Sequence, residues 1–444
     1  MRKKFLVFPL VTVVFVGGIL TWLAWPDTAR LDIAAVSGWR PQITPPRGQV
    51  IPTVKVADAI GWQRGAMPIP AAGLAVQPFA TGLDHPRWLY RLPNGDVLVA
   101  ETNSPPRTGG GVTGWVMGKL MAKAGAGGPS PNRITLLRDT NGDGIAETRS
   151  VLLTGLNSPT GMLLQGKWLY VANTDSLVRY PFTIGETKIT AKPELIVKLS
   201  GGGNHWARNV IAAPDGKTLY VSVGSSTNIG DNGLDKEAYR ANILQVYPEA
   251  KTYRIFAAGL RNPNGMAIEP HSGQLWAVVN ERDMMGSDLA PDYMSQIEFG
   301  DNFGWPWYYW GGYPDSRIPD EDKNPALQEY SKRPDYALGP HTASLGLAFS
   351  FDARLGGSFT NGAFIGQHGS WNRKPVSGYK VVFVPFGTDG FPVRGGKPID
   401  VLTGFLNKDG DAQGRPVGVI TDQTGALLVA DDVGNIVWRV AAKK

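Results

Sequence analysis

Short apolar runs that follow a glycine turn recur along the chain. Each run mixes aliphatic, β-branched and aromatic residues and is bounded by turn residues, which is typical of a buried β-strand. The runs lie at residues 93–100, 166–172, 214–221, 272–278, 361–366 and 424–430. No long amphipathic helical pattern alternates with them, so the sequence indicates an all-β fold rather than an α/β fold.

A polar loop precedes most of these runs by about a dozen residues, so loop and strand form one repeating unit. The loop is clear at 80–87, 153–161 and 258–265, looser at 402–418, and reduced to its polar residues at 204–208 and 340–344. The repeat length of roughly 60 residues suits a four-stranded blade. We therefore predict that residues 76–444 form a six-bladed β-propeller of four-stranded antiparallel blades. A large β-sandwich is the alternative, but it would not explain the repetition.

An apolar run near the N-terminus predicts a membrane segment. The 21 residues from Phe5 to Trp25 carry no charge and follow Arg2, Lys3 and Lys4. Such a run spans roughly 30 Å as a helix, and the charges before it predict that its start stays in the cytoplasm. We expect residues 1–26 to be a transmembrane signal anchor, with a cleaved signal peptide as the alternative.

The expected membrane segment determines where the rest of the chain should lie in the cell. Residues 27–75 are rich in proline and have no clear period, so we interpret them as a tether and irregular lead-in. The propeller would then lie on the periplasmic side of the inner membrane, or free in the periplasm if the segment is cleaved.

Composition narrows the classes of function. With 42% apolar residues, 56 Gly and 34 Pro, the chain suits many short strands joined by tight turns. The absence of cysteine excludes disulfides, thiolate nucleophiles and Cys-ligated metals. The net charge of +6 comes from scattered basic residues, which argues against nucleic-acid binding. A mild positive excess does suit an anionic small ligand.

Polar residues of the repeated loop should converge in space. In a propeller, the loops that enter the innermost strands open at one mouth of the central channel. The residues expected there are His85, Arg87, His205, Arg208, Arg261, Asn262, His341 and Arg415. Clustered guanidinium groups repel one another unless an anion neutralises them, and each can bind a carboxylate at two points. This pattern predicts a multiply carboxylated ligand. The alternative is pairing with acids of the blades such as Glu101, Glu281 and Asp283.

Several ordered motifs from about residue 74 onward resemble the soluble quinoprotein glucose dehydrogenases and, more closely, the sorbosone dehydrogenase-like family. They are Asn204–Gly216 with Leu219–Gly224, Gly259–Ala267, Gly300–Pro306, and Gly366–Arg373 with Gly378–Lys380. The resemblance implies a quinoprotein sugar dehydrogenase that oxidises a sugar, sugar aldehyde or related polyol. It implies pyrroloquinoline quinone, a tricarboxylate, and Ca²⁺ as cofactors. It also implies an electron acceptor, either the quinone pool or a cytochrome.

The resemblance assigns roles by motif position. His205 resembles a catalytic base that removes the proton from the substrate hydroxyl while hydride passes to the quinone. Arg261 matches a position that contacts cofactor oxygens and stabilises developing negative charge. The other implied cofactor-binding residues are Arg87, Arg208, Asn262, His341, His368, Trp371, Asn372, Arg373, Lys374 and Arg415.

Two positions depart from the glucose-type pattern. Asn204 stands where those enzymes have an acid before the histidine, so another group would have to orient His205. The stretch 280–283 differs from their calcium loop, and by position the implied calcium ligands are the backbone carbonyls of Arg282 and Asp283.

Other interpretations remain open. Residues 139–144 with Glu147 resemble the beginning of a calcium loop, but Ser150 stands where a bidentate acid is needed, which favours a plain hairpin turn. A calcium-dependent lactone hydrolase is the alternative enzyme, and it would need carboxylates and Asn around a metal. A non-catalytic propeller that binds protein or glycan is the alternative from another class.

Overall fold

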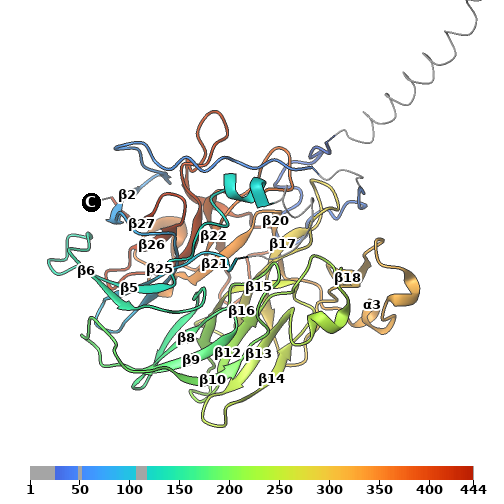
Figure 1. Ribbon diagram of the computed structural model, residues 1–444. Coiled ribbons are helices and arrows are strands. Elements are labelled where there is room, and N and C mark those ends of the chain that lie inside the picture. Colours follow the sequence, from blue (N-terminus) through green and yellow to red (C-terminus); the bar gives the residue numbers. More distant parts are fainter. Residues whose placement is uncertain (1–25, 49–52, 107–117, 444) are drawn as a thin grey trace, which may run out of the picture.

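The computed structural model describes residues 26–48, 53–106 and 118–443, and within them six antiparallel sheets are arranged as the blades of a propeller (Figure 1). The innermost strands of the blades are β3, β7, β11, β15, β21 and β25. Each contacts the next, and β25 contacts β3, which closes the ring. The predicted six-bladed propeller of four-stranded antiparallel blades is therefore confirmed.

The strands of the first four blades follow one another from the channel outward. Blade 1 contains β3 (Pro86–Arg91), β4 (Val97–Glu101), β5 (Arg133–Arg138) and β6 (Thr148–Leu153). Blade 2 contains β7 (Met162–Gln165), β8 (Trp168–Ala172), β9 (Ser176–Pro181) and β10 (Glu194–Lys198). Blade 3 contains β11 (Val210–Ala212), β12 (Leu219–Val223), β13 (Asn242–Tyr247) and β14 (Thr252–Ala257). Blade 4 contains β15 (Asn262–Ile268), β16 (Leu275–Asn280), β17 (Pro291–Ile297) and β20 (Tyr336–Pro340).

The last two blades recruit strands from the N-terminal part of the chain. Blade 5 contains β21 (Ser344–Phe349), β22 (Gly362–Gln367), β23 (Lys380–Pro385), β24 (Ile399–Thr403) and the added edge strand β1 (Ile69–Pro70). Blade 6 contains β25 (Pro416–Thr421), β26 (Leu427–Asp431), β27 (Ile436–Ala442) and the outer strand β2 (Leu74–Ala80). Because β2 pairs with β27, both ends of the domain lie in one blade, and this joint closes the ring.

Short elements decorate the blades. The hairpin β18 (Tyr308–Tyr309) and β19 (Tyr313–Pro314) lies between β17 and β20, followed by η2 (Asp320–Asp322) and α3 (Ala326–Tyr330). The remaining 3₁₀ turns are η1 (Leu234–Glu237), η3 (Ser350–Asp352) and η4 (Gly357–Phe359).

The six glycine-turn runs of the sequence are the second strands of the six blades. These strands, β4, β8, β12, β16, β22 and β26, are buried almost throughout because each blade packs between two others. Between blades 2 and 3, for example, Leu163 and Leu177 belong to the same apolar cluster as Val221 and Leu244. A strand covered on both faces needs a continuous apolar run, which explains why this repeat is the most visible one.

The described residues before β2, 26–48 and 53–73, lie along the propeller rather than free of it. The amide of Ala29 donates to Lys374 O (2.7 Å), Lys55 N donates to Trp371 O (2.9 Å), and Ile60 N donates to Ala412 O (2.9 Å). Figure 1 shows this segment in blue, crossing one face of the propeller. Among the described residues, no helix is long and apolar enough to cross a lipid bilayer. The apolar run 5–25, where an anchor is expected, lies outside the described residues.

Candidate active site

The innermost strands all begin at the same face of the propeller, which we call the mouth. His85 precedes β3, Arg261 precedes β15, His341 lies before β21 and Arg415 precedes β25. Antiparallel order brings the loops that follow the second strands to the same face. Two clusters of charged side chains result, named here after their central acids, Asp432 and Asp283.

The Asp432 cluster joins side chains of blades 1, 5 and 6. Arg87 Nη1 donates to Asp432 Oδ2, while the Nε2 atoms of His368 and His85 lie 2.8 Å and 3.5 Å from the same oxygen. Burial alone would raise the pKa of Asp432, but His368, His85 and Arg87 hold it well below its usual range. Burial lowers the pKa of His368 to about 4 despite Asp432, so this imidazole is neutral at pH 7.

Arg415 completes the Asp432 cluster. Its Nη2 donates to the Tyr379 hydroxyl (2.9 Å), and its guanidinium lies 5.1 Å from the centre of that ring. The neighbouring acid Asp431 is directed elsewhere, since it accepts from the indoles of Trp62 and Trp438. Within the part of the chain described, Arg87 Nε, Arg415 Nε and Asp432 Oδ1 are buried without a hydrogen-bond partner. The cluster therefore has unused donors.

The Asp283 cluster joins blades 3, 4 and 5. Arg261 Nη2 donates to Asp283 Oδ2 (2.9 Å) and to Asn228 Oδ1 (2.8 Å), and its Nη1 donates to Glu281 O (2.6 Å). Burial would raise the pKa of Asp283, but Arg261 and His341 lower it to about 2. Both oxygens of this carboxylate have a partner, because His341 Nδ1 lies 3.2 Å from Oδ1.

His341 is held in its charged form. Its Nδ1 faces the Asp283 carboxylate, and its Nε2 lies 3.1 Å from Gly286 O. A carbonyl and a carboxylate only accept hydrogen bonds, so both ring nitrogens act as donors. Burial is the largest single cause and lowers the pKa of His341, but the hydrogen bond and charge of Asp283, together with the hydrogen bond to Gly286 and the charge of Asp292, raise the pKa overall. A histidine that already carries two protons is a poor general base.

His205 has the opposite arrangement. Its Nδ1 lies 2.8 Å from Ser225 O and 2.9 Å from Ser225 Oγ. Ser225 Oγ in turn donates to Thr227 O (2.7 Å). Because the Ser225 carbonyl accepts only, Nδ1 carries the proton and Nε2 is the basic nitrogen. Ser225 is thus the orienting group that the sequence left unassigned.

His205 and Asn262 flank the same glycine. A Cβ added to Gly224 would collide with Asn262 Oδ1 and with His205 Cβ. Asn262 Nδ2 donates to Asn280 Oδ1 (3.2 Å), while Asn262 Oδ1 is buried and has no hydrogen-bond partner. The absence of a side chain at Gly224 leaves room for both the Cβ of His205 and the amide of Asn262 against the same backbone.

Other predicted site residues face the protein instead of the mouth. Arg208 is fully buried and donates to backbone carbonyls. Arg373 donates to Ser287 O and Pro375 O. Asn372 links Thr53 O to Met284 N, whereas Lys374 is exposed. The 371–374 loop thereby holds the N-terminal segment against the propeller.

The predicted calcium position is occupied by protein donors. Arg282 is fully buried and donates to Pro306 O (2.8 Å) and Tyr308 O (2.7 Å). The carbonyl of Asp283 accepts from Arg317 Nη1 (2.7 Å) and from Asn228 Nδ2 (3.0 Å). A carbonyl that binds a guanidinium is badly placed to bind a second cation, so this geometry does not favour a calcium ion here.

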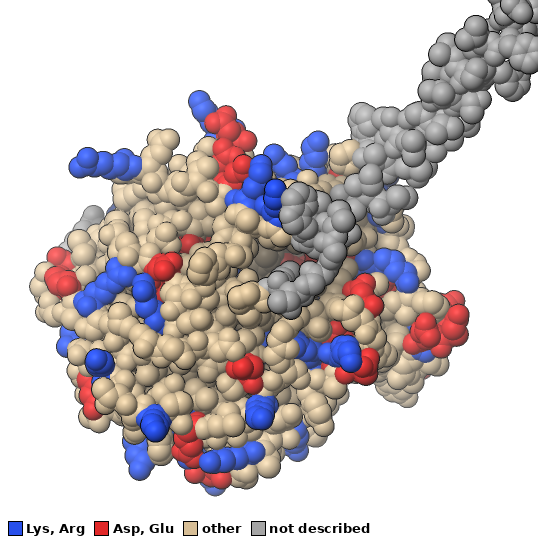
Figure 2. All heavy atoms as spheres, in the orientation of Figure 1, with Lys and Arg blue, Asp and Glu red and all other residues tan. Residues whose placement is uncertain are grey.

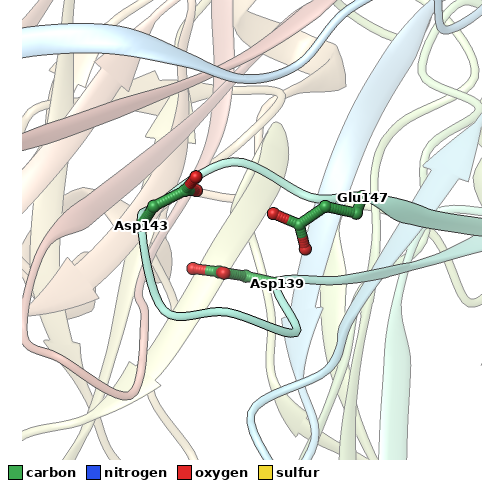
Figure 3. Close-up of side chains that lie close together, drawn as sticks. All are labelled: Asp139, Asp143 and Glu147. Atoms are coloured by element: carbon green, nitrogen blue, oxygen red, sulfur yellow. The ribbon is translucent and has the colours of Figure 1, made fainter.

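A separate group of carboxylates lies in the turn between β5 and β6 (Figure 3). Ligand oxygens of Asp139, Asp143 and Glu147 lie within 4.8 Å of one another. Asp139 accepts from Gly142 N and Gly144 N, and Glu147 accepts from Thr140 N, all at 2.7–2.8 Å. These bonds are those of a tight hairpin turn, and the turn lies at the end of blade 1 opposite the mouth.

Sequence reasoning missed Asp432 and Ser225 as site residues. Both directly follow or nearly follow a second strand, as do Glu281 and His368. A signal for them existed, because the C-terminal end of every glycine-turn strand points to the mouth. Polar residues of the repeated loops therefore form only one part of the mouth, and polar residues after the repeated strands form the other part.

Comparison with known proteins agrees with this architecture. Residues 68–297 and 309–443 match the family model described as TrAA12-like. An uncharacterized protein of Borreliella burgdorferi is 31% identical over 241 residues, which are 54% of this chain and 61% of the relative. A pyrroloquinoline quinone-dependent pyranose dehydrogenase of Coprinopsis cinerea is 25% identical over 358 residues, 71% of this chain and 44% of that protein. The chain thus spans less than two thirds of the length of either relative.

Solved structures share the fold. The holo form of the pyranose dehydrogenase PQQ domain from Coprinopsis cinerea superposes with a TM-score of 0.65 at 20% identity, covering 87% of this chain and all of that domain. The family match extends over all six blades and both strands at the joint of the ring. The chain therefore belongs to the TrAA12-like family.

Proposed function

We propose that this protein is a pyrroloquinoline quinone-dependent dehydrogenase that oxidises a sugar, sugar aldehyde or related polyol. The observation that carries the proposal is the gathering of buried, unpartnered polar atoms at the mouth. They are Nε of Arg87, Arg261 and Arg415, together with Asn262 Oδ1. The three arginine atoms are donors and the amide oxygen is an acceptor; leaving such buried polar atoms unsatisfied is costly, and a polar ligand would satisfy them.

The side chains present fit a flat tricarboxylate. Arg87 and Arg415 offer guanidinium donors for carboxylates. Arg261 and Asn262 would bind polar oxygens at the other side of the mouth, next to His205. The names of the Coprinopsis relative and its solved domain support this cofactor and a pyranose-type substrate.

The chemistry expected of the chain follows from His205. When bound, the quinone supplies the two-electron oxidant. His205 Nε2 accepts the proton of the substrate hydroxyl, while Nδ1 keeps its own proton and donates it in a hydrogen bond to the Ser225 carbonyl. Arg261 places positive charge where negative charge develops. Reduced cofactor requires an acceptor, for which we propose the membrane quinone pool or a cytochrome.

For calcium, the carbonyl of Asp283 already accepts from Arg317 and Asn228, and no step of the proposed reaction depends on the ion. The calcium-dependent lactone hydrolase is less well supported for a related reason. Asp283 and Asp432, the acids of the two clusters, are each bound by an arginine and a histidine. A metal-binding acid should be open to the metal.

The test starts from the full chain purified without cofactor. Pyrroloquinoline quinone is then added, with and without Ca²⁺, and its absorbance spectrum is recorded. Reduction of an artificial dye is followed with a panel of sugars and polyols. We expect a spectral change and sugar-dependent dye reduction only with the quinone. Turnover with NAD alone, or lactone hydrolysis without quinone, would contradict the proposal.

We also propose that residues 1–26 anchor the protein to the periplasmic side of the inner membrane. Asp27, directly after this segment, is bound to the mouth-side loop, since its carboxylate accepts from Ser287 N and pairs with Arg47. An anchor at this point would keep the mouth close to the bilayer, where a lipid-soluble acceptor resides. Deletion of residues 1–26 behind a foreign export signal should release a soluble protein with dye-linked activity. Loss of folding on deletion would contradict the anchor.

A further inference from the structure

The first part of the loop that carries His205 is a run of glycines, which have no side chains that could hold the loop in place. It connects β10 to β11 and begins with Ser200, Gly201, Gly202 and Gly203. Gly202 and Gly203 adopt left-handed backbone conformations, with φ of 73° and 80°. Glycine loses more backbone entropy on ordering than any other residue. The position of His205 therefore depends on what binds the backbone of this loop.

Two buried arginines bind it. Arg208 donates from Nη1 to His205 O (2.8 Å) and Ala207 O (2.9 Å), and from Nη2 to Ser200 O (2.8 Å). Arg240 donates from Nη2 to Gly201 O and Gly202 O, and from Nη1 to Gly224 O (3.3 Å). The two guanidinium groups together collect carbonyls from both ends of the glycine run and from the residue before Ser225.

Within the described ranges, Arg208 and Arg240 form no ion pair, in contrast to Arg87 and Arg261 at the mouth. Arg208 is 0% exposed, and burial together with nearby Arg240 lowers its pKa to about 9. Burial also lowers the pKa of Arg240. A buried charge without a counter-ion is unfavourable unless oriented dipoles surround it. Here the loop carbonyls supply those dipoles, so the charge and the loop conformation depend on each other.

Ser225, the hydrogen-bond partner of the His205 ring, lies in a loop that is held by Glu237. Glu237 is buried and accepts from Ser226 N (2.6 Å), Thr227 N (3.0 Å) and Thr227 Oγ1 (2.9 Å). Asn204 N donates to Ser226 O (2.7 Å), which joins the two loops. The loop of the base and the loop of its hydrogen-bond acceptor thus form one unit around Arg208 and Arg240.

We propose that Arg208 and Arg240 are positioning residues for His205. They hold the ring so that Nδ1 donates its proton in a hydrogen bond to the Ser225 carbonyl and Nε2 is directed to the reacting hydroxyl. The role of His205 as the base rests on the proposed function, whereas the clamp itself does not. The sequence assigned Arg208 to cofactor binding, but its hydrogen bonds are to the loop. Lysine cannot replace either residue, because one ammonium group cannot reach carbonyls in the directions of a guanidinium fork.

The test compares Arg208→Lys and Arg240→Lys with Arg179→Lys. Arg179 is a similarly buried arginine, but it lies in blade 2 and is paired with Glu194 and Glu249. We expect kcat to fall about tenfold to a hundredfold in the two clamp variants, since misplacement of a general base costs part of its contribution. KM and the affinity for the quinone, measured by absorbance titration, should change less than about threefold. Arg179→Lys should keep wild-type kcat.

A second measurement needs no activity. The chain has five histidines, so ¹⁵N–¹H spectra of the imidazoles can be assigned with His205→Gln. In wild-type protein without quinone, His205 should show the single tautomer protonated at Nδ1. The clamp variants should show tautomer averaging and a shifted pH titration of this ring, with the other four rings unchanged.

The outcomes separate the two proposals. Clamp variants with wild-type His205 resonances and wild-type kcat would overturn the clamp. Altered resonances in a protein that never reduces dye with quinone would retain the clamp and contradict the proposed function. Should Arg208→Lys fail to fold, Arg240→Gln leaves the Arg208 bonds in place and removes only those to Gly201, Gly202 and Gly224, and the same criteria apply to it.

Discussion

The Asp432 and Asp283 clusters contain the same types of residue at the mouth, drawn from different positions of the blades, and they differ in which of their polar atoms have partners. Both have an acid that follows a second strand, an arginine that enters an innermost strand, and a histidine. In the Asp283 cluster both carboxylate oxygens and both ring nitrogens of His341 have partners. In the Asp432 cluster one carboxylate oxygen and the Nε atoms of Arg87 and Arg415 have none, and in the Asp283 cluster Arg261 Nε has none.

The two clusters also differ in how the backbone of the central acid is held. Arg317, which follows the β18–β19 hairpin, donates to Asp283 O, and Asn228 from blade 3 donates to the same oxygen. Clusters of similar composition therefore leave different atoms for a ligand, namely one carboxylate oxygen and two arginine Nε atoms at Asp432 and one arginine Nε atom at Asp283. Figure 2 shows that elsewhere on the visible face lysine and arginine alternate with acids, without one large basic patch.

The largest expected effect distinguishes the two histidines beside the Asp283 cluster. His205→Ala should reduce turnover about 10²–10⁴-fold with little change in quinone affinity, because a general base acts mainly in the transition state. His341→Ala should retain more activity, since His341 is already protonated at both nitrogens. Dye-linked kcat and quinone titration measure both variants, and exposed His271→Ala is the control. A normal rate in His205→Ala would show that another residue is the general base.

The next effect concerns the acids. Asp432→Asn removes the carboxylate that pairs with buried Arg87, and breaking such a pair typically costs about 3–5 kcal/mol. Asp283→Asn should cost less, because Arg261 keeps its bonds to Asn228 and Glu281 O. Urea unfolding of both variants at pH 7 measures the two costs. Added quinone should raise the Tm of Asp432→Asn more than that of wild type. Equal costs in the two variants would remove the distinction between the clusters.

The clusters should also respond to pH in opposite directions. His368 has a folded pKa of about 4, below the unfolded value of about 6.5, so the unfolded chain binds the proton first. Its contribution is fully present above about pH 6.5 and falls by about 3 kcal/mol toward pH 4. His341 has a raised pKa, so its contribution is present below about pH 6.5 and is lost as the pH rises through its folded value.

Unfolding free energies between pH 4 and 9 test this contrast. His368→Gln should flatten the acid side of the profile, although the depressed pKa of Asp432 still causes losses at lower pH. His341→Gln should flatten the neutral to alkaline side. Asp432, Arg87 and Arg415 surround the first histidine, and Asp283 and Asp292 the second. Profiles that change on the same side in both variants would contradict the assignment.

The smallest expected effect is on cofactor affinity. Arg261→Ala removes a charge-assisted hydrogen bond worth about 1.5–3 kcal/mol, so quinone affinity should fall roughly tenfold to a hundredfold. The rate should fall with it, in contrast to His205→Ala. Absorbance titration against the quinone measures this effect, with Arg133→Ala, which pairs with Glu101 away from both clusters, as the control. Unchanged affinity would mean that the Asp283 cluster only holds the fold.

Much of the architecture could be predicted from the chain itself. The number of blades followed from counting glycine-turn strands, since a strand buried on both faces must be apolar wherever it recurs. The mouth residues followed from the loops before the innermost strands. Cofactor and reaction could not be obtained in this way, and they rest on resemblance and on the proposal made above.

The sequence by itself determined which residues reach the mouth, because strand order and alternation are local properties of the repeats. Only the tertiary structure decided what those residues do there. Arg87 meets Asp432 across the joint of the ring, a sequence separation of 345 residues. Arg208, from an equivalent loop, turns inward to its own backbone. Both are arginines in the same repeat position, and the difference arises because pairing depends on the distance and direction between blades, which no local pattern encodes.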